Sequence, residues 1–191
     1  MIRETIVTTV SDLDEVHLAP IGVIVEGDAR IIAPFRPSTT LDNLRANPFA
    51  VVNYTDDVRV FAGCLTGRRT WSTRPATHTP GAVLEQSLAH AEVKVTHVEE
   101  DDVRPRFTCE VVHTESDAPF QGFNRAQAAV VEAAILVSRL HMLPMEKIDT
   151  EIAYLEIAVA KTAGPGEREA WGWLIERIEE FKRQSAREKQ A

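Results

Sequence analysis

The feature that most constrains what this chain can fold into is a hairpin pattern followed at once by a cluster of hydroxyls. Residues 16–25 and 30–35 are apolar and rich in β-branched side chains, and the turn between them contains Gly27. This arrangement predicts a β-hairpin. Pro20 and Gly22 are unusual inside the first strand, because proline cannot donate a ladder hydrogen bond and glycine packs no side chain. They indicate a bulge, or a place where another molecule lies against the backbone.

Further short strand patterns lie on both sides of this hairpin. They cover residues 4–10, 50–54, 58–65, 91–95 and 107–111. The last two alternate apolar and polar side chains, which is typical of antiparallel strands with one solvated face. Residues 66–90 are irregular, with a short helix favoured at 83–88. A meander of short strands with one early helix predicts a small β-barrel.

The hydrophobic pattern becomes helical in the last third of the chain. Residues 126–140 are apolar on nearly every face, and residues 148–159 and 171–181 keep an apolar stripe at helical spacing. The predicted fold class is therefore mainly β with α. We expect a barrel domain over residues 1–122 and a three-helix C-terminal domain over residues 123–191.

Composition excludes several classes of function. The net charge of −8 argues against a nucleic-acid binder, which needs a surface that neutralises phosphates. No apolar run has the length of a membrane span, and the first residues lack a signal-peptide pattern, so a cytoplasmic location is expected. Two cysteines and six histidines show no metal-ligand spacing, so we predict no metal site. A small-molecule ligand or a protein partner remains.

The hydroxyl cluster is the strongest candidate site. Ser38, Thr39 and Thr40 open a short helical pattern, directly after Arg36. A helix N-terminus offers unpaired N–H groups and a positive dipole end to an anion, and arginine can bind phosphate at two points. The alternative is a capping box with Thr39 as N-cap and Asp42 bonding back to it. Local chemistry alone favours the cap, because capping boxes are common and phosphate sites are not.

Several motifs together carry a family resemblance that spans nearly the whole chain. They are Glu4–Thr9, Ala19–Gly22, Pro34–Leu44, Val51–Asp57 and Gly122–Ala126. The sequence resembles the FMN-binding split-barrel superfamily, whose flavin reductases and flavoredoxins show similar strands and a similar helix start. His17 stands where those proteins usually have asparagine. The chain is more closely similar to the DUF447 family, which adds helices after the barrel.

The resemblance implies noncovalently bound FMN in a homodimer, with the flavin near the subunit interface. The residues implied to bind its phosphate are Arg36, Ser38, Thr39 and Thr40, with Asn43 ordering that loop. The backbone of Pro20, Ile21 and Gly22 would face the isoalloxazine ring, and N–H groups there would stabilise the reduced, more anionic ring.

Asn124 and Arg125 start the most apolar helix and form a second candidate site. One hypothesis is that Arg125 reaches over the flavin and helps to bind it or an anionic substrate, with Asn124 beside it. The alternative is structural: Asn124 is an N-cap, Gln127 completes a capping box, and Arg125 pairs with Glu132. The sequence favours neither interpretation over the other.

The function that the resemblance implies is an FMN-dependent oxidoreductase, similar to flavin reductases, that moves hydride through flavin N5. Its substrate would be a small molecule, with a pterin of one-carbon metabolism as one hypothesis. No side chain is an evident acid or base, so no catalytic residue is assigned. That same lack supports an alternative, a non-enzymatic flavin-binding or storage protein. A third hypothesis is a barrel that has lost its cofactor and serves as an interaction module.

Overall fold

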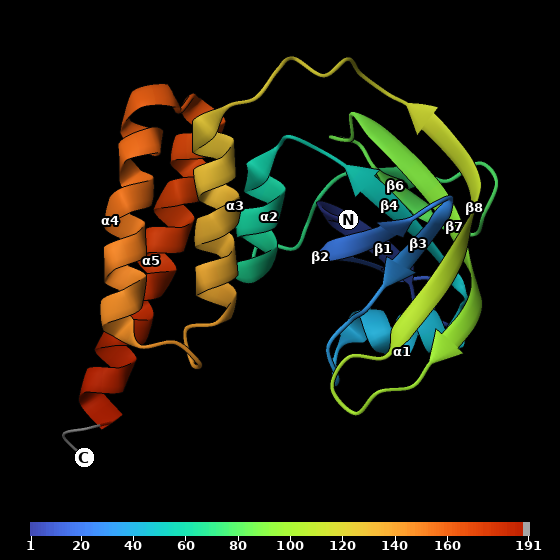
Figure 1. Ribbon diagram of the computed structural model, residues 1–191, viewed down its shortest axis with the longest axis horizontal. Coiled ribbons are helices and arrows are strands. Elements are labelled where there is room, and N and C mark those ends of the chain that lie inside the picture. The colour runs from blue at the N-terminus through green and yellow to red at the C-terminus, as the bar shows by residue number, and fades with distance from the viewer. Residues whose placement is uncertain (189–191) are drawn as a thin grey trace. The chain divides into compact units, whose positions relative to one another are not determined.

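The computed structural model describes residues 1–188, which form two compact units (Figure 1). The barrel unit comprises residues 1–56 and 70–120, and the helical unit comprises residues 57–69 and the chain from residue 121 onward. The chain therefore leaves the barrel unit for one short segment before returning to complete it. The sequence pattern, which assigns residues 58–65 to the barrel, does not reveal this excursion.

Six antiparallel strands close the barrel of the first unit. They are β1 (Ile2–Val10), β2 (Val16–Glu26), β3 (Ala29–Ile32), β4 (Phe49–Tyr54), β7 (Ala89–Glu99) and β8 (Arg106–Ser116). Their order around the barrel is β1-β2-β3-β8-β7-β4, so the sheet closes through the pairing of β1 with β4. The predicted barrel is confirmed.

The barrel core is built from alternating inward side chains, as the period-2 pattern requires. Val7, Val52 and Phe107 are fully buried there. Helix α1 (Thr39–Ala46) adds Leu41 and Leu44 to the same cluster, so the helix is anchored to the barrel by its apolar face. The hydroxyl cluster at the start of α1 is thereby held in a fixed place on the barrel.

A small two-stranded sheet, β5 (Thr73–Pro75) and β6 (Ala82–Leu84), lies against β1 and β4. The buried side chain of Asn53 fastens it. Its amide nitrogen donates to the Ile6 carbonyl at 2.9 Å, and its amide oxygen accepts from the Leu84 backbone N–H at 2.9 Å. The helix expected at residues 83–88 is therefore wrong, because a tertiary contact draws residues 82–84 into an extended strand.

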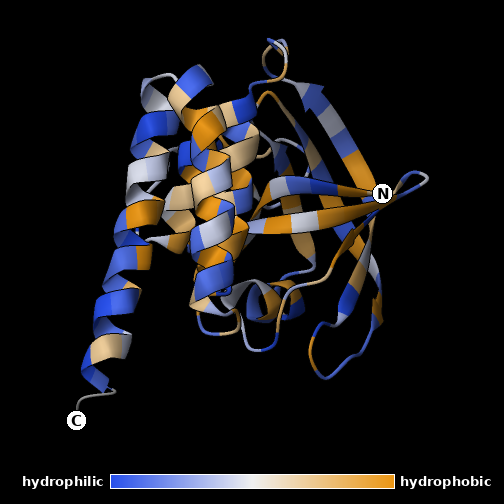
Figure 2. Cartoon of the chain, turned by 60° about the vertical axis from the view of Figure 1, so that its left-hand side comes forward, coloured by the Kyte–Doolittle hydropathy of each residue, from blue (hydrophilic) through white to orange (hydrophobic). Residues whose placement is uncertain are grey.

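The helical unit contains α2 (Val58–Leu65), α3 (Arg125–Ser138), α4 (Met145–Thr162) and α5 (Pro165–Glu188). The last three confirm the helices expected from the periodicity. Figure 2 shows hydrophobic residues along α3 and mostly hydrophilic ones in the last turns of α5. No helix within residues 1–188 is long and apolar enough to cross a membrane.

Helix α2 corrects the prediction of a strand at residues 58–65. The Asp57 carboxylate caps the helix by accepting from the Arg59 N–H at 3.1 Å. Val58 and Ala62 are buried in the core that α2 shares with α3 and α5. A short apolar run fits a buried helix as well as a buried strand, and only its packing partners decide between them.

Candidate functional site

The start of α1 is an N-cap with unused donors. Ser38 is the cap, because its hydroxyl oxygen accepts from the Leu41 N–H at 3.3 Å. The capping box expected on Thr39 is therefore wrong by one residue, since Thr39 is already helical. The first N–H groups of a helix have no partner inside it. Within residues 1–188, the backbone N–H groups of Thr39 and Thr40 show no hydrogen bond, so they remain available to an anion.

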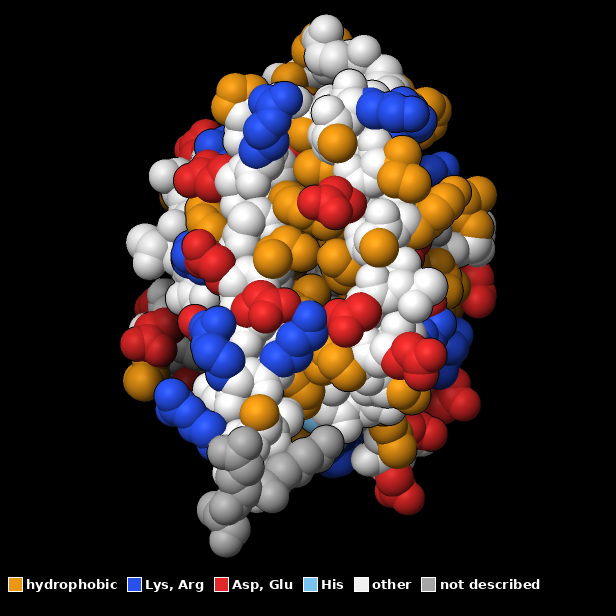
Figure 3. Space-filling model, turned by 90° about the vertical axis from the view of Figure 1, so that its left-hand side faces the viewer, with side chains coloured by type: hydrophobic (Ala, Val, Ile, Leu, Met, Phe, Trp, Pro, Cys, Tyr) orange, Lys and Arg blue, Asp and Glu red, His pale blue; other side chains and the backbone are white. Residues whose placement is uncertain are grey.

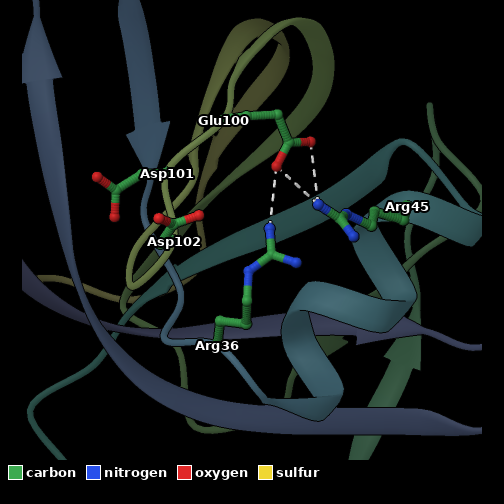
Figure 4. Close-up of a pocket in the computed structure, with 5 residues that line it drawn as sticks. All are labelled: Arg36, Arg45, Glu100, Asp101 and Asp102. Carbon is green, nitrogen blue, oxygen red and sulfur yellow. Dashed lines mark hydrogen bonds and ion pairs between the residues drawn. The ribbon is translucent and has the colours of Figure 1, made fainter.

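Arg36 lies in an open pocket of about 540 Å³ lined by Arg36, Arg45, Glu100, Asp101 and Asp102. Figure 4 shows Glu100 between the two guanidinium groups. Its carboxylate lies 2.9 Å from Arg36 and 2.8 Å from Arg45. Three carboxylates thus face two arginines, and Glu100 occupies the guanidinium positions that a phosphate would use. An anion gains Arg36 only by displacing Glu100.

The loop that carries Glu100 is held to Arg36 by its backbone as well. The Arg36 N–H donates to the Val103 carbonyl at 2.9 Å. Asp101 accepts from the backbone N–H groups of Arg104 and Val103, and these bonds lower the pKa of its carboxyl group. The acidic side of the pocket is therefore ordered and stays ionised at neutral pH.

Strand β2 has one open edge at the residues expected to face a flavin ring. It pairs with β1 from Val16 to Ile24, whereas β3 pairs only with Ile24–Glu26. In the described chain, no strand covers the other edge of Ala19–Val23. Pro20 is tolerated there because a strand edge without a partner needs no donor. Successive N–H groups of a strand point to opposite edges, so only one of Ile21 and Gly22 can donate at the open edge.

Gly22 has a packing reason of its own. A Cβ added at this position would lie 2.9 Å from the Ile2 side chain and 3.2 Å from the Glu4 carboxylate. The glycine therefore makes room for the neighbouring strand β1. This contact explains the residue without a ring against the backbone, so Gly22 alone is weak evidence for a ligand.

The helix start and the open strand edge belong to one region of the barrel. Asn43 of α1 is buried, and its amide donates to the Thr9 hydroxyl of β1 at 3.0 Å. Thr9 pairs with His17, and three residues along the same ladder Ile6 pairs with Pro20. At roughly 3.3 Å per residue the two features are about 10 Å apart along the strand. The expected ordering role of Asn43 takes the form of this tie between α1 and β1.

The second predicted site begins α3 in the helical unit. Asn124 is the N-cap: its side-chain oxygen accepts from the Ala126 N–H at 2.8 Å, and its amide donates to the Thr162 carbonyl at 3.2 Å. Gln127 bonds to Glu167 instead of completing a capping box. Arg125 is exposed, and no ion pair with Glu132 forms. Asn124 thus has a structural task, and the role proposed for Arg125 stays a prediction.

A buried polar cluster on β7 escapes sequence analysis. Glu92 has no exposed surface and accepts four hydrogen bonds from the backbone and hydroxyl groups of Thr77–Thr79. Burial raises the pKa of Glu92, but the hydrogen bonds outweigh it and hold the pKa at about 2. His90 beside it contacts Asp117 at 2.8 Å, and Arg74 pairs with the same aspartate. The alternating pattern places Glu92 in solvent; only the fold reveals the covering loop.

The cysteines are core thiols, as expected, although Cys64 lies on helix α2 and not on a strand. Burial raises the pKa of Cys64 to about 11 and that of Cys109 to about 12. Neither is a thiolate at neutral pH, and nucleophilic chemistry needs the thiolate. Within residues 1–188, no three His, Cys, Asp or Glu side chains are arranged to hold a metal.

Comparison with protein families assigns the chain. Residues 3–118 match the model described as "Protein of unknown function (DUF447) N-terminal domain", and residues 124–176 match "Protein of unknown function (DUF447)". The chain belongs to the DUF447 family. No curated protein matches it. The resemblance noted from the sequence motifs is confirmed, and the boundary between the two family models falls near the one expected at residue 122.

Solved structures show the fold of this DUF447 protein. An FMN-bound DUF447 protein, MM1853 from Methanosarcina mazei, aligns with a TM-score of 0.79 at 20% identity, over 92% of this chain and 94% of that one. Nitrilotriacetate monooxygenase component B from Mycobacterium thermoresistibile aligns at 0.52, with 16% identity over 63% and 73% of the two chains. Flavoredoxin of Desulfovibrio vulgaris aligns at 0.50, with 11% identity over 61% and 70%.

Proposed function

We propose that this DUF447 protein binds FMN in the barrel unit, with the phosphate at the start of α1 and the ring along the open edge of β2. The observation that carries the proposal is the pairing of two unsatisfied backbone features about 10 Å apart on one ladder. The free N–H groups of Thr39 and Thr40 suit an anion, and the unpaired edge at Ala19–Val23 suits the polar rim of a flat heterocycle.

The likeness to an FMN-bound DUF447 protein over almost its full length supports the same cofactor here. Arg36 and the Ser38 hydroxyl would complete the phosphate site, since the Ser38 oxygen accepts the capping bond and its O–H can still donate. Asn43 keeps α1 in place. The fit is incomplete at one point, because Glu100 competes for Arg36.

The activity we propose is that of an FMN-dependent oxidoreductase acting on a small molecule. Bound FMN supplies two-electron transfer through N5, and the chain supplies position and hydrogen bonds. Structural neighbours that include a monooxygenase component and a flavoredoxin support this class. The homodimer with flavin near its interface and the pterin substrate stay predictions.

The experiment compares FMN with riboflavin, which lacks the phosphate. Both are titrated into the apoprotein and followed by flavin fluorescence. If the phosphate binds at the α1 start, the wild type binds FMN at least tenfold more tightly than riboflavin. Arg36→Ala and Thr39→Ala should shrink that ratio, because they remove phosphate partners only. Ser138→Ala, which removes a hydroxyl from the end of α3, is the control. An unchanged ratio in both variants would refute the site, and absent FMN binding would refute the function.

Anaerobic mixing with NADH and NADPH tests the activity separately. An oxidoreductase that takes electrons from a pyridine nucleotide bleaches its flavin absorbance with one of them. A flavin that stays oxidised with both donors contradicts that reductase activity and favours the storage alternative.

A further inference from the structure

Helix α4 has an apolar surface on the side where a helix of a soluble protein normally carries charges. Ile148, Ile152, Leu155 and Val159 face the helical core. On the opposite side, Tyr154 is 75% exposed and Ile157 is 51% exposed. Ala153 and Ala160, which are also exposed, flank them at helical spacing. Figure 3 shows hydrophobic side chains gathered over the face that α4 and α5 present.

The charges around this surface have an uneven arrangement. Beside it, Lys147 pairs with Glu151, and Asp149 pairs with Lys182 of α5. Glu146 and Lys161 lie at the two ends of the exposed stripe and make no ion pair within the described chain. We name residues Glu146, Thr150, Ala153, Tyr154, Ile157 and Lys161 the α4 stripe. It is apolar in the middle, acidic at its N-terminal end and basic at its C-terminal end.

We propose that the α4 stripe is a self-association surface, on which α4 of a second copy packs antiparallel. A two-fold axis between positions 153 and 154 places Glu146 of each copy opposite Lys161 of the other. The same axis sets the large Tyr154 against the small Ala153 and Ile157 against Thr150. Glu146 and Lys161 are about 22 Å apart along the helix, so both ion pairs form together at the two ends of the contact.

The charge pattern selects this partner over others. An isologous contact requires a surface that is complementary to itself, and the α4 stripe meets this condition only in the antiparallel sense. A parallel arrangement would put Glu146 against Glu146 and Lys161 against Lys161. The inference does not rest on flavin binding, because α4 belongs to the helical unit and the proposed phosphate and ring contacts to the barrel unit.

Sedimentation velocity of the full chain over a concentration series tests the proposal. The wild type should self-associate, and Ile157→Glu should remove that association, because it places a charge in the apolar centre. Lys161→Glu and Glu146→Lys should each raise the dissociation constant at least fivefold, since each sets like charges opposite one another. Arg187→Glu on α5 is the matched control, a charge reversal at an exposed helical position outside the stripe, and should change nothing.

The decisive sample is an equimolar mixture of the Lys161→Glu and Glu146→Lys variants. One copy then carries two acidic ends and the other two basic ends, so they should combine as a heterodimer with affinity near that of the wild type. Circular dichroism confirms that each variant is folded. A wild type that stays monomeric at every concentration, association that survives Ile157→Glu, or no recovery in the mixture would overturn the proposal. FMN titration of the same samples reports separately on the proposed function.

Discussion

Glu92 illustrates how one side chain can fasten a loop. Its carboxylate is buried and ionised, and every hydrogen bond that holds it comes from residues 77–79. These donors have no other role in the fold that requires an anion. The loop and the carboxylate therefore stabilise each other, and the loss of either leaves buried polar groups without partners.

The pKa of Glu92 gives a pH dependence with a definite sign. A folded-state pKa of about 2, below the ordinary 4.5, adds stability above pH 4.5 that is lost as the pH falls toward 2. The full effect is up to about 3 kcal/mol. Glu92→Gln should therefore lower the unfolding free energy at pH 7 by about 1–3 kcal/mol. Urea denaturation at pH 7 and pH 2.5 should show this gap closing at the lower pH.

The exposed Glu110 of β8 supplies the control for that measurement. Glu110→Gln should leave the unfolding free energy unchanged at both pH values, because its carboxylate is solvated. A gap for Glu92→Gln that is constant with pH would show that the charge of Glu92 is not what holds the loop.

Individual residues were predictable from sequence only where their partners lie nearby in the chain. Ser38 acts on Leu41, three residues away, and the hydroxyl cluster predicts a helix start there. Glu92 fits the polar positions of an alternating strand, and nothing local distinguishes it from the solvated Lys94. Its burial depends on a loop about 14 residues upstream that folds over the strand. No pattern in a single sequence encodes that contact.

At the scale of elements, α1 and the 99–105 loop compete for the same ligand space. Helix α1 offers free N–H groups, and the loop places Glu100 on the two arginines beside them. The sequence predicts the helix and its Arg36 but not the loop, because Glu100 follows Arg36 by 64 residues. The same limit explains α2, whose apolar run reads equally well as a strand until α3 and α5 are in place.

This competition predicts that Glu100→Gln tightens FMN binding. The change removes one negative charge from the pocket and frees Arg36 and Arg45, so the phosphate meets less repulsion. We expect the FMN dissociation constant to fall severalfold, with little change for riboflavin. Fluorescence titration at low salt measures both.

Glu99→Gln makes the same charge change one residue away, where the carboxylate faces Arg106. It should alter FMN affinity far less than Glu100→Gln. Equal effects would mean that overall charge, and not the arginine pair, controls binding. Weaker FMN binding in Glu100→Gln would place the phosphate away from Arg36.

For the whole molecule, the order of the two units along the chain matters. The barrel and the C-terminal helices were predictable because long periodic segments identify them, and the family models match both. The excursion of residues 57–69 into the helical unit was not, since it depends on which core accepts α2. A boundary at residue 122 therefore divides the helical unit.

A chain truncated at residue 122 should consequently fold poorly. It retains α2 but lacks α3 and α5, which cover Val58 and Ala62, so an apolar helix is left exposed. We expect soluble yield to fall strongly and the sample to aggregate in size-exclusion chromatography. Replacing residues 57–69 by a glycine-serine linker in the truncated chain should recover soluble barrel. A monodisperse, soluble 1–122 fragment with α2 intact would contradict the assignment of α2 to the helical unit.

The early position of α2 also has a consequence during synthesis. Roughly 60 residues separate the end of α2 from the start of α3. At roughly 5–20 residues per second the ribosome delivers α2 several seconds before its packing partners. For that interval the nascent chain carries an unburied greasy helix between two halves of a forming sheet. Translation speed across β5 to β8, and chaperones that hold such a helix, should therefore govern how much of this protein reaches its native state.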